Sequence, residues 1–191
     1  FSKEILQKEK RPEANFAIMI VNALMYVALL YFCGLKSNWI GNLPLIKYAV
    51  LTPMLLSALV IDYRLQIIPN RLNLTMFEIG LIFTFLYGII NINMGMNMLL
   101  GGIAGAGIFL VITLLGGLIA GKEAMGFGDV KLMGALGLYF GLSNIIAISV
   151  LSFLIGAIAS IVLIATKIKK TDEYIPFGPF IVISTFIVIF V

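Results

Sequence analysis

Histidine is absent from this chain, and cysteine occurs only once, as Cys33. Without histidine, Ser–His–Asp and Cys–His catalysis, haem ligation by imidazole and most zinc enzymes are excluded. A single cysteine within an apolar run excludes an internal disulfide and a cysteine-ligated zinc site. The chemistry must therefore come from carboxylates, lysines, hydroxyls or the backbone, and we expect no metal and no cofactor.

Charge is also scarce. Asp, Glu, Lys and Arg make up 12% of the 191 residues, whereas 61% of the residues are hydrophobic. A soluble domain carries about 25% charged residues. The apolar runs are also long enough to cross a bilayer, which takes about 20 residues of helix. We therefore expect an all-α fold, a polytopic integral membrane bundle of about six to seven transmembrane helices.

Seven apolar segments are candidate membrane spans. They lie near residues 14–35, 45–61, 71–90, 98–120, 129–143, 144–166 and 177–191. The segment 129–143 is short for a span, so it is a tilted helix, a partly buried helix or a re-entrant element. Residues 1–13 are polar and do not look like a signal peptide. We assign 1–13 to a cytoplasmic N-terminal segment and 14–191 to one membrane-embedded domain.

The basic residues predict the orientation of the spans. With the N-terminus in the cytoplasm, the only lysines or arginines on the outside are Lys36 and Lys47, and the others of the 13 lie inside. This distribution agrees with the positive-inside rule. The net charge of +4 therefore reflects membrane topology, and no nucleic-acid partner is expected.

Two aspartates, Asp62 and Asp129, stand at the ends of apolar runs. Two predicted crossings separate them, so both are expected at the cytoplasmic boundary. Placing an acidic side chain at a membrane boundary costs free energy, so an acid found there is first interpreted as functional. Two neighbouring carboxyl groups share a proton: one takes a proton from water while the other polarises a carbonyl, as in aspartic proteases. This chemistry needs neither histidine nor a metal.

Simpler interpretations of these acids are open at this stage. Asp129 follows glycines and precedes a helix, so it could be an N-cap. Asp62 could be a boundary residue that reaches toward water beside Arg64. Glu78, about two turns into the third span, fits a packing role better than tuning of the pair. A small proton- or ion-coupled transporter using the same acids is the alternative function, although the two halves show no clear repeat.

The residues near the two aspartates supply further candidates for the site. Gly126 and Gly128 let the backbone come close to a substrate beside Asp129, and Pro69 suits the first turn of a helix. The candidates near the substrate are Pro69, Asn70, Gly126, Phe127, Gly128 and Lys131.

Glycines also repeat at a spacing of four residues. The pairs are 101 and 105, 117 and 121, and 137 and 141. Small residues at this spacing let membrane helices approach closely, so we expect helix contacts there.

Three strings in this order resemble a known family. They are Asp62 followed by Ile68-Pro69-Asn70, then Gly126-Phe127-Gly128-Asp129-Val130-Lys131, and then Pro176-Phe177-Gly178-Pro179. Together they resemble the type IV prepilin peptidases, which are membrane aspartic proteases of the GxGD type, over roughly residues 45–190. Presenilin-like proteases share Gly-x-Gly-Asp, but their late motif is Pro-Ala-Leu, which this chain lacks at the corresponding place.

The resemblance implies that Asp62 and Asp129 are catalytic and that residues 14–191 form a membrane-embedded aspartic peptidase domain. It implies a prepilin or pseudopilin as substrate, cut after a glycine between its basic leader and its hydrophobic helix. It also implies an integral protein of the bacterial inner membrane, surrounded by lipid, with its active site at the cytoplasmic face. Many bacterial members carry paired cysteines that accompany N-methylation. Nothing here matches them, so we do not expect methyltransferase activity of these 191 residues.

Overall fold

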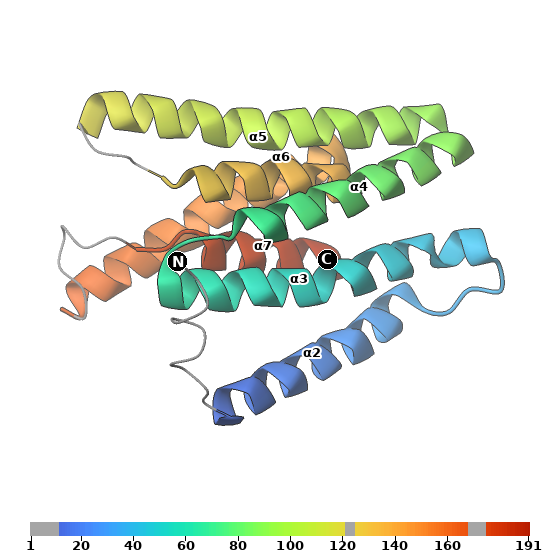
Figure 1. Cartoon of the computed structure of the whole chain (residues 1–191), viewed down its shortest axis with the longest axis horizontal. Coiled ribbons are helices and arrows are strands. Elements are labelled where there is room, and N and C mark those ends of the chain that lie inside the picture. Colours follow the sequence, from blue (N-terminus) through green and yellow to red (C-terminus); the bar gives the residue numbers. More distant parts are fainter. Residues whose placement is uncertain (1–11, 121–124, 168–174) are drawn as a thin grey trace. The chain divides into compact units, whose positions relative to one another are not determined.

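The computed structural model describes residues 12–120, 125–167 and 175–191, and the regular elements in these ranges are helices (Figure 1). The elements are α2 (Pro12–Cys33), the short 3-10 helix η1 (Trp39–Asn42), α3 (Leu43–Leu65), α4 (Asn70–Ile90), α5 (Ile92–Ala120), α6 (Phe127–Ala165) and α7 (Gly178–Phe190). Five of them, α2 to α6, are long and apolar enough to cross a membrane, and α7 is shorter. The predicted helical membrane bundle is confirmed. Helices suit these apolar runs because they satisfy every backbone polar group within the segment.

The chain divides into two compact units, residues 1–56 and 57–191. In the first unit, the Tyr26 hydroxyl on α2 donates to the carbonyl of Ala49 on α3 at 3.1 Å. The second unit contains the end of α3 and all of α4 to α7, and therefore every residue of the three family-like strings.

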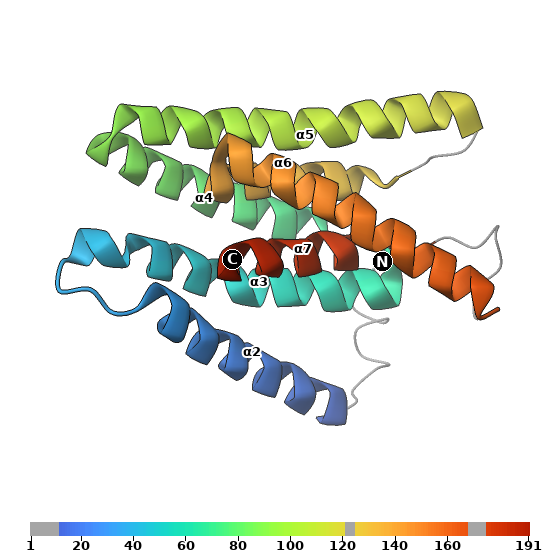
Figure 2. The ribbon, with the colours of Figure 1, turned by 180° about the vertical axis from the view of Figure 1, so that it is seen from behind.

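Helix α6 reverses direction at Gly141. This residue has φ 74° and ψ 179°, a backbone region that only glycine adopts without strain. An added Cβ on Gly105 of α5 would meet both Met133 and Ile145, on opposite sides of the reversal. These two residues would lie about 18 Å apart in a straight helix. The two halves of α6 therefore run in opposite directions, as Figures 1 and 2 show.

The reversal explains the short segment predicted at 129–143. The first half of α6 is buried at nearly every position from Val130 to Gly141. Of the three predicted possibilities, this burial supports a helix that is covered by its neighbours. Asn97 of α5 supports the turn by accepting the N–H of Leu142 at 3.2 Å. With α6 counted as two segments, the helices of the described residues match the seven predicted ranges.

Glycines bring α5 and the first half of α6 into close contact. A Cβ on Gly101 would lie 2.6 Å from the Gly137 carbonyl oxygen, and one on Gly105 would lie 2.5 Å from the Met133 carbonyl oxygen. The contacts predicted from the glycine spacing are thus confirmed for 101, 105, 137 and 141. Position 121 lies outside the described residues.

We expect Gly105→Ala to destabilise the bundle by about 1–3 kcal/mol, because the new methyl group meets backbone that cannot move away cheaply. The matched control is Gly107→Ala on the same helix, where an added Cβ meets nothing within 4 Å. That change should be neutral or stabilise by up to about 1 kcal/mol. Unfolding of the two purified variants in detergent micelles measures the difference. Equal midpoints would contradict the close α5–α6 contact.

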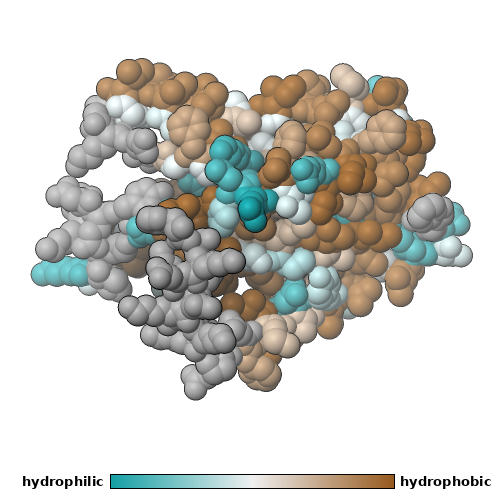
Figure 3. Space-filling view, in the orientation of Figure 1, coloured by the Kyte–Doolittle hydropathy of each residue, from teal (hydrophilic) through white to brown (hydrophobic). Residues whose placement is uncertain are grey.

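Polar side chains fix α4 against the first half of α6. The Thr84 hydroxyl donates to the Leu138 carbonyl at 3.1 Å, and the Tyr139 hydroxyl donates to the Met76 carbonyl at 2.9 Å. Both hydroxyls are buried, where an unpaired polar group would be costly. On the face that Figure 3 shows, in contrast, most of the surface is hydrophobic. These two hydrogen bonds therefore fix α4 beside the first half of α6.

Candidate active site

Asp62 lies in the last turn of α3 with only 3% of its surface exposed. Its Oδ2 accepts a hydrogen bond from the backbone N–H of Gly178, at the start of α7, at 2.9 Å. A side chain that reached for water would be exposed. The simpler interpretation of Asp62 as a boundary residue is therefore wrong.

The segment after Asp62 packs against the second motif, Gly126 to Lys131. Gln66 ends α3 with φ 55°, and its N–H donates to the Asp62 carbonyl at 2.8 Å. Pro69 is the N-cap of α4, one residue before the first turn in which the sequence predicted it. Between them, Ile68 is buried and lies against Gly128, where an added Cβ would be 3.2 Å from the Ile68 Cβ. Gly128 thus lets the two motif strings pack closely.

Asp129 is buried in the first turn of α6, with 3% of its surface exposed. The N-cap of this helix is Gly126, whose carbonyl accepts the Asp129 N–H at 3.0 Å. The interpretation of Asp129 as the N-cap is therefore wrong. The contact of Ile68 with Gly128, the residue before Asp129, brings the Asp62 and Asp129 segments to the same end of the unit. The Asp129 Oδ1 is buried and has no hydrogen-bond partner among the described residues.

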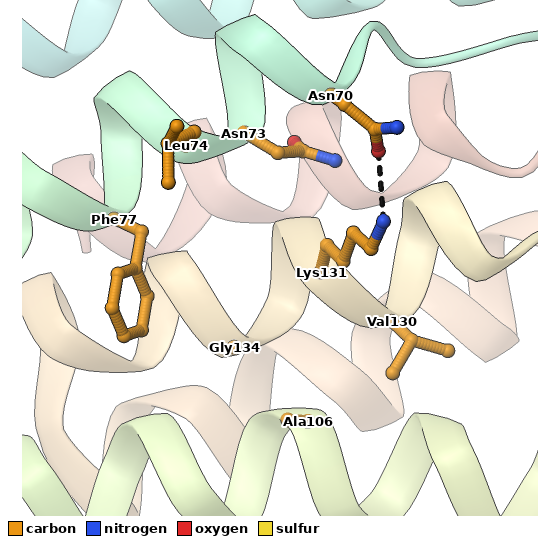
Figure 4. A pocket seen from close by; sticks show the side chains of 8 residues that line it. All are labelled: Asn70, Asn73, Leu74, Phe77, Ala106, Val130, Lys131 and Gly134. Atoms are coloured by element: carbon orange, nitrogen blue, oxygen red, sulfur yellow. Dashed lines mark hydrogen bonds between the residues drawn. The ribbon is translucent and has the colours of Figure 1, made fainter.

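Two side-chain hydrogen bonds hold the Asp129 segment against α4. Asn73 is buried, and its Nδ2 donates to the Gly128 carbonyl at 3.0 Å. Lys131 donates from Nζ to Asn70 Oδ1 at 2.8 Å, as Figure 4 shows. The candidate Phe127, in contrast, is 56% exposed. The structure thus brings the predicted site residues to one end of the second unit.

The start of α7 is fixed by an aromatic cluster. The ring of Phe177 lies 5.1 Å from that of Phe153, 6.0 Å from that of Phe109 and 5.9 Å from that of Phe180, measured between centroids. Such contacts stabilise beyond the burial of area alone. The cluster holds the neighbouring Gly178 beside Asp62.

Glu78 does not join this site. Its side chain on α4 is exposed, so it does not have the packing role that its position in the sequence suggested. Among the residues that the structure describes, no group of three or more His, Cys, Asp or Glu is arranged to hold a metal ion.

Several known proteins are similar to this chain in sequence. A prepilin leader peptidase/N-methyltransferase of Aeromonas hydrophila is 31% identical over 170 residues, which cover 89% of this chain and 56% of that protein. Proteins of the same name from Escherichia coli and Neisseria gonorrhoeae are 28% identical over 83% of this chain and 32% identical over 73% of it. The chain spans about half the length of most of these relatives, from 46% of the Neisseria protein to 78% of the Escherichia coli protein.

No solved structure matches the chain. Residues 49–161 match the model of the type IV leader peptidase family, a range that contains both aspartates. The chain therefore belongs to the type IV leader peptidase family.

Proposed function

We propose that this protein is a membrane aspartic endopeptidase that removes the basic leader from prepilins or pseudopilins. The observation that carries the proposal is that Asp62 and Asp129, far apart in the chain, are both buried at the same end of the second unit, where Ile68 packs against Gly128. The relatives are named prepilin leader peptidases, which supports this substrate class. Burial of two acids together has a high cost in free energy, which favours a function for the pair.

The proposed mechanism divides one proton between the two carboxyl groups. Asp62 accepts the Gly178 N–H, and such a hydrogen bond favours the ionised form of a carboxyl group. We therefore assign Asp62 as the general base and Asp129 as the proton donor. Asp62 takes a proton from water as the water oxygen attacks the scissile carbonyl carbon, and Asp129 protonates the carbonyl oxygen. Breakdown of the tetrahedral intermediate breaks the C–N bond. The leaving amine takes the proton held by Asp62, and one hydroxyl of the intermediate returns its proton to Asp129, which restores the starting state of the pair.

The membrane setting suits a leader peptide. The bias of lysine and arginine toward one side of the predicted spans supports a site at the cytoplasmic face. There the basic leader stays in water while the hydrophobic helix of the substrate enters the bilayer. The proposal covers the peptidase activity alone: the names of the relatives also include N-methyltransferase, but the chain spans about half the length of most of them.

The decisive experiment uses the full chain reconstituted in liposomes with a prepilin that has a basic leader, a glycine before the cut and a hydrophobic helix. We expect release of the leader, seen as a shorter product by mass spectrometry. The matched substrate carries valine in place of that glycine and should resist cleavage. No cleavage of either substrate, together with a proton or cation flux into the liposomes, would support the transporter instead.

A further inference from the structure

A groove of about 400 Å³ lies between α4, α5 and α6, next to the Asp129 segment. Figure 4 shows its lining. It is lined by Asn70, Asn73, Leu74, Phe77, Ala106, Val130, Lys131 and Gly134. The mechanism proposed above uses none of these residues.

The groove is apolar along its length and polar at one end. Leu74 and Phe77 on α4 form an exposed hydrophobic wall. Asn70 and Lys131 stand together at the end where α4 and α6 begin, joined by their hydrogen bond. Phe77 lies about 10 Å further along α4 than Asn70. The groove thus extends from the polar end into the apolar part of the span.

The polar end carries positive charge. Lys131 is exposed, and none of the described carboxylates forms an ion pair with it. One of its three N–H donors is used by Asn70, so two remain. The exposed Arg71 in the first turn of α4 adds a second cation at the same end. An anion is therefore the complementary ligand.

The charge and the shape of the groove select a ligand that is anionic at one end and apolar along its length. A phospholipid has both parts, a charged headgroup and an extended acyl chain. Basic pockets between transmembrane helices at a membrane boundary bind lipid headgroups.

We propose that this groove binds one anionic phospholipid. Its phosphate contacts Lys131 and the amide of Asn70, and one acyl chain lies along Leu74 and Phe77. The lipid thereby makes the Asn70–Lys131 contact depend on the composition of the membrane. Lys131 lies two residues after Asp129 in the chain. The inference deepens the proposed function by naming a lipid partner of the same site, and binding can be measured without any cleavage.

The test uses the full chain in liposomes with a phosphatidylglycerol that carries a photoreactive group on its acyl chain. We expect labelling at Leu74 or Phe77, competed by unlabelled phosphatidylglycerol but not by phosphatidylcholine. Lys131→Gln should weaken the apparent affinity about fivefold, the contribution of one basic residue near an anionic headgroup. Leu74→Trp should abolish labelling by filling the groove.

The matched control is Leu99→Trp, an exposed leucine in a second apolar groove between α4 and α5, and it should leave the labelling unchanged. Equal competition by phosphatidylcholine would mean that the groove contacts lipids without selecting the anionic ones, and it would overturn the proposal. Displacement of the label by a prepilin would overturn it too, because the groove would then hold substrate. A wild-type protein that binds lipid but cleaves no prepilin would overturn the proposed function alone.

Discussion

Replacing Asp129 with asparagine is expected to lower the rate of prepilin cleavage by about 10³-fold, within the range that general acid–base groups contribute. Asparagine has nearly the same shape but cannot pass a proton to the scissile carbonyl. Asp62→Asn should have a similar effect, since the amide oxygen can still accept the Gly178 N–H but cannot take a proton from water. The measurement is the initial rate of leader release by each variant in liposomes.

Both variants should remain folded, so that the loss can be assigned to chemistry. Asp62→Asn removes the buried charge, Asp129→Asn replaces a protonated carboxyl group, and both leave the shape of the site unchanged. Unfolding in detergent should therefore occur at or above the wild-type midpoint. Glu78→Gln is the matched control, because it removes an exposed acid from the neighbouring helix and should keep full activity. Cleavage that survives either aspartate substitution would refute the catalytic pair.

The helices were predictable because a membrane-spanning helix needs a long apolar run, and such runs are visible in the sequence. An apolar run of about 20 residues leaves the chain no alternative to a helix in lipid. The short segment at 129–143 stayed open because hydropathy does not report which neighbour covers a helix. Its burial depends on Gly101 and Gly105 of another helix, which make room for it. The glycine spacing predicted close contact but not which helices would meet.

The site was predictable only in part, for a similar reason. Asp62 and Asp129 were conspicuous because acids are rare in membrane spans. Asn73 was not singled out, and Gly178 was noted only as part of the string Pro176-Phe177-Gly178-Pro179, although both donate hydrogen bonds within the site. The signal for Asn73 is a polar residue one turn into an apolar helix. Gly178 acts through its backbone, which every residue carries, so only the fold reveals its partner.

Gly178→Ala is expected to lower the turnover of a prepilin by about 10²-fold, as misplacing a catalytic group by about 1 Å does. An added Cβ would lie 2.5 Å from Asp62 Oδ2 and 2.9 Å from Asp62 Cγ. The carboxylate must rotate away, and it then loses the hydrogen bond that fixes it. Because the new methyl group meets the carboxylate, kcat should fall while KM changes little.

Gly107→Ala is the control for the substitution itself, since a Cβ there meets nothing within 4 Å. It should leave both kcat and KM unchanged. The double variant Gly178→Ala with Asp62→Asn separates positioning from general damage. If Gly178 acts only by holding the Asp62 carboxylate, the double variant should be no slower than Asp62→Asn alone, because the group being held has already lost its function. A further loss would mean that Gly178 also supports the substrate or the start of α7. Full activity of Gly178→Ala would show that the Gly178 N–H has no role in the mechanism.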